Sequence, residues 1–481
     1  MENKLKNKVL SGLFWKLMEN GGNNGIQLIV SIVLTRLLVP DEYAVIALLS
    51  MFIMIANVFI QNGFTTALIQ KKNADETDFS SIFYLNLVVS FILYGILFLA
   101  APYIAEFYQR SEIIPGLRVL SIVLIIGSVN AIQNAVVVKQ LKFRQLCYSG
   151  FASSILSGIV GISMAYIKPD YWALIAQQIV YQLVLAIFLW GFVKWRPKLL
   201  FSTERVKTLF HFGGKLLLSS VIDTIYTNIY GMVIGKRYSS SLSFYNKGDS
   251  YPLFISNNVN GAIQSVMLPA LSLEQNNINK LKSMVRRSIV TSSFIMFPIM
   301  IGLAAVAKPL IAILLTDKWL PCVPYMQIMC FSYALWPIHT ANLQAINAVG
   351  RSDIFLKLEI VKIMIGIVVL CISLPFGIMV MVAFKPVVSL ISSFINAYPN
   401  KRLLNYSFGE QWKDIFPSFL LALIMGALVY AVQFLGLNVW ATLLIQIGTG
   451  VVIYIGSAYL IKMECFFYLI NTMNELRGKK Q

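Results

Sequence analysis

Charged residues are scarce in this 481-residue sequence. They make up 12% of it, whereas an ordinary soluble domain carries about 25%. Hydrophobic residues make up 58%, and the mean hydropathy is +0.73. A soluble core cannot absorb that much apolar surface, so the composition excludes a soluble globular protein. It predicts an integral membrane protein.

Residues and motifs typical of catalysis and metal binding are also few. The five cysteines are scattered without a C-x-x-C spacing, and the two histidines, His211 and His339, are too few for a zinc site. No glycine-rich phosphate loop, nucleophile elbow or external acidic pair is present. We therefore expect no enzyme, no bound metal and no cofactor, and only coupling to a Na⁺ or H⁺ gradient is left open.

The net charge of +18 would suit nucleic acid, but its distribution indicates membrane topology instead. The basic residues lie in short loops at the ends of apolar runs. Most of them lie in loops predicted to be on the same side of the membrane as the N-terminus. Cytoplasmic loops are enriched in Lys and Arg. We therefore predict that both termini are cytoplasmic and that nucleic acid is not a partner.

The apolar runs are long enough to cross a bilayer, which takes roughly 20 residues per helix. Their periodicity is helical or unbroken rather than alternating, which disfavours a barrel. The predicted fold is all-α, a polytopic membrane protein with about 14 transmembrane helices. The predicted spans are 12–38, 42–68, 79–100, 117–137, 148–167, 171–193, 212–235, 242–270, 288–307, 323–347, 353–373, 376–397, 414–435 and 438–461.

The two halves of the chain resemble each other at an offset of about 200–209 residues. LTRLLVPDEYA is matched by IGKRYSSSLSFY, and LAAPYIAEFY by VAKPLIAILL. Because six spans are an even number, the repeats are parallel, as in many secondary transporters. We predict an N-terminal lobe at 1–193, a basic linker at 194–211, a C-terminal lobe at 212–400 and a last part, spans 13–14 with the tail, at 401–481. The linker is expected to lie on anionic lipid.

Polar residues inside the first span form a stripe at helical spacing. Asn20, Asn23 and Gln27 continue a stripe that begins with Lys16 and Glu19. Such a stripe either lines a cavity or holds helices together, and both interpretations stay open. Gly21, Gly22 and Gly25 allow close helix approach or a bend.

Ionisable residues at membrane depth are costly and usually functional. Asp223 in span seven either binds a coupling ion or pairs with a lysine. Lys247, with Asp249, is placed near the external end of span eight without deep burial. Lys385 has no carboxylate in its own predicted helix, which suggests an anionic ligand or a partner on another helix. Glu359 and Lys362 are expected to neutralise each other at i,i+3, and His339 to be a packed polar residue.

Two long segments resemble bacterial polysaccharide exporters of the multidrug/oligosaccharidyl-lipid/polysaccharide flippase superfamily. The first runs from GLFWKLMEN through LTRLLVPDEYA to NGFTTALIQ, and the second from LLSSVIDTIYTNIYG through FYNKGDSYP to SVMLPALS. The resemblance covers roughly residues 10–460. It implies a flippase that moves a polyprenyl-pyrophosphate-linked oligosaccharide to the outer leaflet by alternating access. Arg36 and Arg237, at the external ends of the equivalent first and seventh spans, become candidates for guiding the pyrophosphate.

The predicted substrate-binding candidates are Arg36, Arg237, Lys247, Lys385, Asn20, Asn23 and Gln27, and the predicted ion-coupling residue is Asp223. The protein is expected to act as a monomer in the bacterial cytoplasmic membrane, with the polyprenyl-linked glycan and polysaccharide assembly proteins as partners. The rival functions are a cation-coupled small-molecule exporter of the same superfamily and a membrane glycan polymerase.

Overall fold

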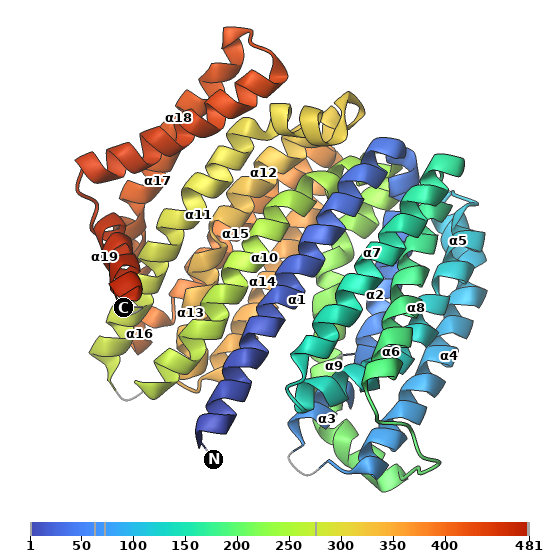
Figure 1. Cartoon of the computed structure of the whole chain (residues 1–481). Helices are drawn as coiled ribbons and strands as arrows, with labels where there is room; N and C mark the ends of the chain where they lie inside the picture. The colour runs from blue at the N-terminus through green and yellow to red at the C-terminus, as the bar shows by residue number, and fades with distance from the viewer. Residues whose placement is uncertain (1, 62–63, 72–73, 275–276, 479–481) are drawn as a thin grey trace. The chain divides into compact units, whose positions relative to one another are not determined.

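The structure is a computed structural model that describes residues 2–61, 64–71, 74–274 and 277–478, with some side chains within these ranges outside the described part. Every regular element of the described ranges is helical (Figure 1). The predicted all-α fold is therefore confirmed. The contacts divide the chain into two compact units, Met1–Ser243 and Phe244–Gln481.

The described residues of unit 1 form nine α-helices. They are α1 (Glu2–Leu37), α2 (Pro40–Gln61), α3 (Phe64–Gln70), α4 (Glu76–Tyr108), α5 (Ile113–Leu120), α6 (Ile122–Lys139), α7 (Phe143–Ile167), α8 (Trp172–Phe192) and α9 (Thr203–Arg237). Helix α7 lies alongside both α1 and α8, as Figure 1 shows, while α6 packs against α4 and α8. Helix α2 lies between α6 and α9.

Small residues let α1 and α7 approach closely. A Cβ atom on Gly22 would lie 2.3 Å from the Phe151 ring, and one on Gly158 would lie 2.5 Å from Val30. The prediction of close approach is thus confirmed for Gly22. At Gly21 and Gly25 the space is open.

Unit 2 is arranged around α11, which packs against α12, α13, α17 and α18. Its elements are α10 (Leu242–Leu273), α11 (Ile278–Leu315), α12 (Val323–Ala334), α13 (Trp336–Ala348), α14 (Ser352–Ser373), α15 (Ile378–Ala397), α16 (Asn400–Leu403), α17 (Phe408–Ala431), α18 (Val439–Leu460) and α19 (Glu464–Gly478). A 3₁₀ segment, η2 (Asp317–Cys322), links α11 to α12, and its Trp319 is fully buried.

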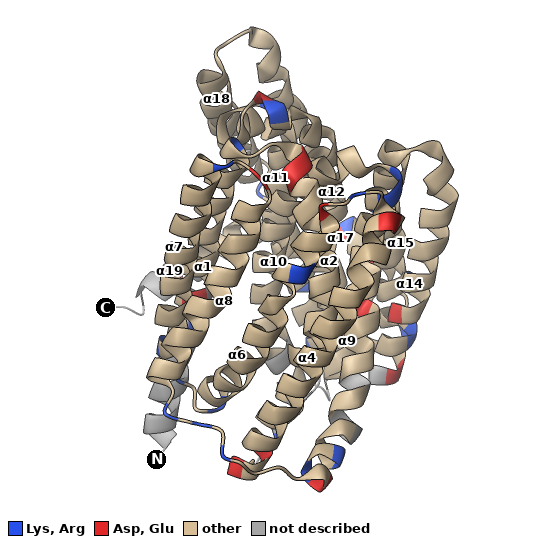
Figure 2. Ribbon diagram, turned by 90° about the vertical axis from the view of Figure 1, so that its right-hand side faces the viewer, with Lys and Arg blue, Asp and Glu red and all other residues tan. Residues whose placement is uncertain are grey.

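Ten helices of the described residues are long and apolar enough to cross a membrane. The other four predicted spans correspond to α1, α10, the pair α12–α13 and α14. Helices α1, α10 and α14 carry polar residues noted in the sequence, and the span formed by α12 and α13 is broken. Figure 2 shows charged residues gathered mainly near helix ends, with a few along the helices. The protein is a multi-pass membrane protein, and the number fourteen stays a prediction.

The order of the helices repeats along the chain. Helix α2 begins at Pro40 and α10 at Leu242, and α4 begins at Glu76 and α11 at Ile278. The fourth span of each half is broken in the same way, at Ser121 between α5 and α6 and at Leu335 between α12 and α13. The predicted internal repeat is therefore visible in the element order.

Helix α9 begins the second repeat, yet its contacts are with α2, α3 and α4 of unit 1. The boundary between the units accordingly falls at the start of α10. Whether the predicted lobes 1–193 and 212–400 move as bodies stays a prediction.

The linker before α9 is fixed to the N-terminal end of α4. The backbone amides of Lys198 and Ser202 donate to Ser80 Oγ (3.1 Å) and Ser81 Oγ (3.0 Å). Beside them Asp78, fully buried, accepts two hydrogen bonds from Lys71 Nζ at 2.7 and 2.6 Å. Leu199 projects away and is 95% exposed. The linker is thus held by protein on one side and presents an apolar side chain on the other, as an interfacial segment would.

An ion-pair network completes this attachment. Arg205, in the first turn of α9, lies 3.6 Å from Asp78 and 3.3 Å from Asp75, which caps α4. A hydrogen bond from the Asp78 amide, together with Arg205, holds the pKa of Asp75 below its ordinary value. The Asp75 carboxylate therefore stays charged, and keeps its bonds, at neutral pH.

Candidate functional site

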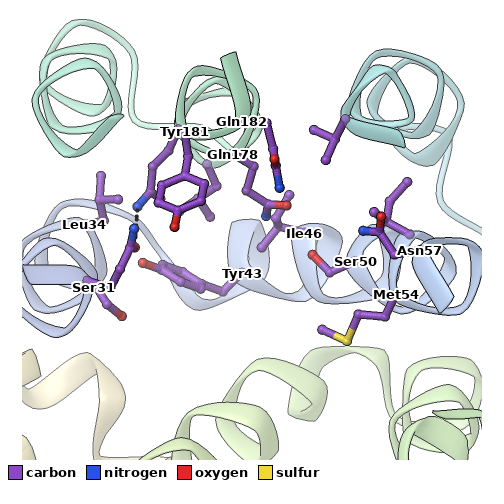
Figure 3. Close-up of a pocket in the computed structure, with 15 residues that line it drawn as sticks. Ser31, Leu34, Tyr43, Ile46, Ser50, Met54, Asn57, Gln178, Tyr181 and Gln182 are labelled. Carbon is purple, nitrogen blue, oxygen red and sulfur yellow. Dashed lines mark hydrogen bonds between the residues drawn. The ribbon is translucent and has the colours of Figure 1, made fainter. Parts of the chain in front are cut away.

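Unit 1 contains a pocket of about 520 Å³, lined by both polar and apolar side chains, between α1, α2, α6 and α8 (Figure 3). This volume lies within the range of small-molecule binding sites. We call it the amide pocket, because amide and hydroxyl groups dominate its polar lining. The lining residues are Gln27, Ser31, Leu34, Tyr43, Ile46, Ser50, Ile53, Met54, Asn57, Val123, Leu174, Gln177, Gln178, Tyr181 and Gln182.

A chain of hydrogen bonds runs from the amide pocket into the α1–α7 interface. Gln177 Nε2 donates to Gln27 Oε1 at 3.5 Å, and Gln27 Nε2 donates to Ser154 Oγ at 3.3 Å. Ser154 Oγ then donates to Asn23 Oδ1 at 2.8 Å. Gln27 therefore borders the pocket, whereas Asn23 joins two helices. The polar stripe therefore serves both purposes: Gln27 lines a cavity, and Asn23 holds helices together.

The far end of the amide pocket is ordered by Asn130 on α6. Its Nδ2 donates to the Gln182 backbone carbonyl and to Gln182 Oε1, both at 3.0 Å. Because a carbonyl only accepts, the bond to the backbone fixes which way the Asn130 amide faces. Gln182 must then present Oε1 to Asn130, so its NH₂ group is left to donate elsewhere.

A second pocket of about 400 Å³ lies between α2 and α9 in the same unit. It shares Met54 and Asn57 with the amide pocket. Its other lining residues are Val58, Gln61, Asp223, Thr224, Thr227 and Asn228. Asp223 is exposed and brings a carboxylate to this pocket, which suits a cation.

Unit 2 holds a cluster of side chains in which half-buried Lys385 meets the buried tyrosines Tyr245 and Tyr333. Lys385 Nζ donates to the hydroxyl of Tyr245 at 2.5 Å and lies 4.9 Å from the centre of its ring. Tyr333 donates to Asp249 Oδ1 at 2.7 Å. The interhelical partner expected for Lys385 is therefore a tyrosine of α10. Tyr245 was among the polar residues that the sequence shows in span eight, whereas Tyr333 was not predicted, because aromatic residues are frequent in every span.

The expectation that Lys247 needs no deep burial is wrong. Its side chain is 8% exposed, and Nζ lies 5.9 Å from the centre of the Trp319 ring. The 3₁₀ segment η2 covers this turn of α10. The sequence of η2 reads as a short connecting loop and did not indicate that it would bury Lys247. Burial beside an aromatic ring favours a cation–π contact over an exposed position.

The remaining sequence candidates lie at helix ends or outside the described side chains. Arg36 is exposed in the last turn of α1, and Arg237 is exposed at the end of α9. Neither belongs to the two pockets described above. The Asn20 side chain lies outside the described residues. Their roles in binding stay predictions.

Two structural interpretations are confirmed. Lys362 Nζ lies 2.6 Å from Glu359 Oε1 within α14, which neutralises both charges. His339 Nε2 lies 3.3 Å from Ser389 Oγ, and its Nδ1 lies 3.1 Å from Asn396 Nδ2. His339 is thus a packed polar residue, as expected.

Several pocket residues escaped sequence reasoning. Gln177, Gln178 and Gln182 are amides in the apolar run of α8 and carry no charge to attract notice. Their spacing was a usable signal, since Gln178 and Gln182 are four residues apart and share one face of a helix. Tyr181 follows Gln177 by the same interval.

Neutralising Lys385 is expected to weaken transport. In Lys385→Met the methionine is only slightly shorter than the lysine but cannot donate to Tyr245, so α15 loses a charged contact with α10. We expect export to fall about tenfold at unchanged protein level, measured as surface polysaccharide per membrane-inserted protein. Lys357→Met is the control, because Lys357 is exposed on α14. Equal export by both variants would exclude Lys385 from transport. The same assay on Arg237→Gln tests whether Arg237, predicted at the external end of span seven, contributes to transport.

Ten helices of the described residues that are long and apolar enough to cross a membrane define a polytopic membrane protein. The fold is similar to that of the solved lipid II flippase MurJ in an inward closed conformation, with a TM-score of 0.77 at 16% identity over 94% of this chain and 99% of that one. Residues 33–324 match the family model described as polysaccharide biosynthesis protein. The chain belongs to this family.

Two curated relatives cover most of the chain. The teichuronic acid biosynthesis protein TuaB of Bacillus subtilis is 23% identical over 431 residues, 89% of each chain. The succinoglycan biosynthesis transport protein ExoT of Rhizobium meliloti is 21% identical over 342 residues, 71% of this chain and 69% of that one. The family resemblance noted in the sequence is confirmed.

Proposed function

We propose that this protein is a flippase for polyprenyl-pyrophosphate-linked oligosaccharide, acting by alternating access in the biosynthesis of a cell-surface polysaccharide. The observation that carries the proposal is the amide pocket, a hydroxyl- and amide-lined site among membrane-spanning helices. Sugars cannot cross about 30 Å of hydrocarbon unaided. The relatives' roles in polysaccharide biosynthesis and transport support the same substrate class.

In this proposal the protein lies in the bacterial cytoplasmic membrane with both termini in the cytoplasm. It acts as a monomer and receives its substrate from polysaccharide assembly proteins. It catalyses no covalent step, and its partners are the lipid-linked glycan in the bilayer and the polysaccharide assembly proteins. The polyprenyl chain stays in lipid while the glycan passes through the protein.

The direct test is translocation by purified protein in vesicles. An undecaprenyl-pyrophosphate-linked glycan is placed in both leaflets, and a membrane-impermeant glycosidase added outside trims only the outer pool. With active flippase we expect nearly all of the glycan to be trimmed, and about half in protein-free vesicles. The proposal fails if protein-containing vesicles also stop at half.

Asp223 is proposed to couple transport to a Na⁺ or H⁺ gradient. Its carboxylate borders the second pocket beside Asn57 and Asn228. We expect Asp223→Asn to abolish the acceleration by an imposed gradient while gradient-free exchange continues. The measurement is the initial trimming rate with and without each gradient. Glu106→Gln is the control, because Glu106 is an exposed acid on α4. A gradient response retained in Asp223→Asn excludes this role.

A small-molecule exporter is the second candidate, and Asp223 is the observation that favours it. A carboxylate among hydroxyl and amide groups also suits an organic cation. Vesicles that expel a fluorescent organic cation, yet leave the lipid-linked glycan in its original leaflet, would support this candidate over the flippase.

A further inference from the structure

The amide pocket carries hydrogen-bonding groups but no full charge. None of its fifteen described lining residues is Asp, Glu, Lys or Arg. Five are amides, namely Gln27, Asn57, Gln177, Gln178 and Gln182, and each amide offers one acceptor oxygen and two donor hydrogens. This combination matches neighbouring hydroxyl groups, which also donate and accept.

Some of these groups are oriented but not satisfied within the described protein. Asn130 holds Gln182 so that the NH₂ group of Gln182 is left to donate. The buried Oδ1 atom of Asn57 has no hydrogen-bond partner among the described residues. A buried polar atom without a partner is unfavourable, so a ligand hydroxyl that bonds to Asn57 would relieve that cost.

Two aromatic rings complete the pocket. Figure 3 shows Tyr43 approaching from α2 and Tyr181 from α8, with Gln178 and Gln182 on the same side of α8. A tyrosine ring offers an apolar face and a polar tip. That suits a sugar ring, which has C–H groups on its faces and hydroxyls around its rim.

We propose that the amide pocket binds an uncharged sugar residue of the transported glycan and selects against a sugar that carries a carboxylate. This inference rests on the proposed flippase function and names the substrate class of its site. A uronate in the pocket would lose its hydration without gaining a cation, which is unfavourable. The pyrophosphate must then be held by cations outside this pocket.

The test compares three lipids bound to the full-length protein in nanodiscs. They are undecaprenyl pyrophosphate, the same lipid bearing a glucose disaccharide, and the same lipid bearing the disaccharide with its terminal glucose oxidised to glucuronate. We expect the glucose lipid to bind at least tenfold more tightly than the glucuronate lipid, as measured by native mass spectrometry. Gln178→Lys adds a cation and is expected to reverse this order.

Loss of the amides gives the second arm. The double variant Gln178→Leu/Gln182→Leu is expected to weaken binding of the glucose lipid about tenfold and to leave binding of the sugar-free lipid unchanged, which also reports on folding. Gln178→Glu is the near-isosteric variant if the double variant does not fold, and it should weaken glucuronate binding further. Gln140→Leu, at an exposed amide that ends α6, is the matched control.

The outcomes separate the inference from the function on which it rests. Equal affinity of the wild-type protein for the glucose and glucuronate lipids overturns the inference alone. So does glucose-lipid binding that Gln178→Leu/Gln182→Leu leaves intact. If the wild-type protein binds none of the three lipids, the proposed function fails and the inference fails with it.

Discussion

Asp78→Asn is expected to destabilise unit 1 by about 3 kcal/mol, because it breaks a buried ion pair and leaves charge without a partner. The Asp78 carboxylate is fully buried and accepts both bonds from Lys71, while Arg205 lies 3.6 Å away. The asparagine keeps the shape but not the charge. We expect the apparent melting temperature in detergent to fall by roughly 6–10 °C.

The same change is expected to release the linker. Arg205 belongs to α9, and the bonds to Ser80 and Ser81 hold the segment before it. Protease cleavage between residues 195 and 205 should therefore become faster in Asp78→Asn. Glu76→Gln is the matched control, since Glu76 pairs with Lys198 on the surface and such pairs contribute at most about 1 kcal/mol. If both variants melt alike, the buried pair does not stabilise the fold.

Gly248→Ala is expected to destabilise unit 2 by about 3 kcal/mol, at the upper end of overpacking costs. A Cβ atom at this position of α10 would lie 2.7 Å from the Cys322 carbonyl oxygen and 2.8 Å from the Met326 amide nitrogen. Both atoms are backbone and cannot rotate away. Helix α10 must move, and the neighbouring Lys247 and Asp249 must move with it. We expect a lower melting temperature and a comparable loss of transport.

Gly261→Ala on the same helix supplies the control. No atom lies within 4 Å of a Cβ placed there, so the alanine should be neutral or stabilise the helix by about 0.5–1 kcal/mol. Stability of Gly248→Ala equal to that of Gly261→Ala would show that α10 has room to shift and would refute the close contact.

The helices were largely predictable because long apolar runs mark the positions of most of them. The breaks within the fourth and tenth spans could not be predicted from the sequence. At Ser121 the hydroxyl donates to the Leu117 carbonyl at 2.6 Å, and at Leu335 the following Pro337 opens a new helix. Both depend on local geometry inside an apolar run, where hydropathy does not change.

The site was predictable only in part. The sequence drew attention to charged residues, and this led to Asp223 and Lys385, but the amide pocket is built mainly from neutral groups on α2 and α8. Gln27 was found because it continues a visible stripe. Asn57 stands alone among apolar neighbours in α2, and only its contacts reveal that it borders the same cavity as Gln178.

Helix α9 has a consequence for the order in which the nascent chain can fold. It covers α2, α3 and α4, yet it is synthesised after every other helix of unit 1. Domains generally fold as units during synthesis, with the N-terminal one first. Until residue 237 has left the ribosome, the surface of α2, α3 and α4 that α9 covers stays exposed in the insertion machinery. Pausing of translation just before α9 would therefore be more harmful than pausing just after it.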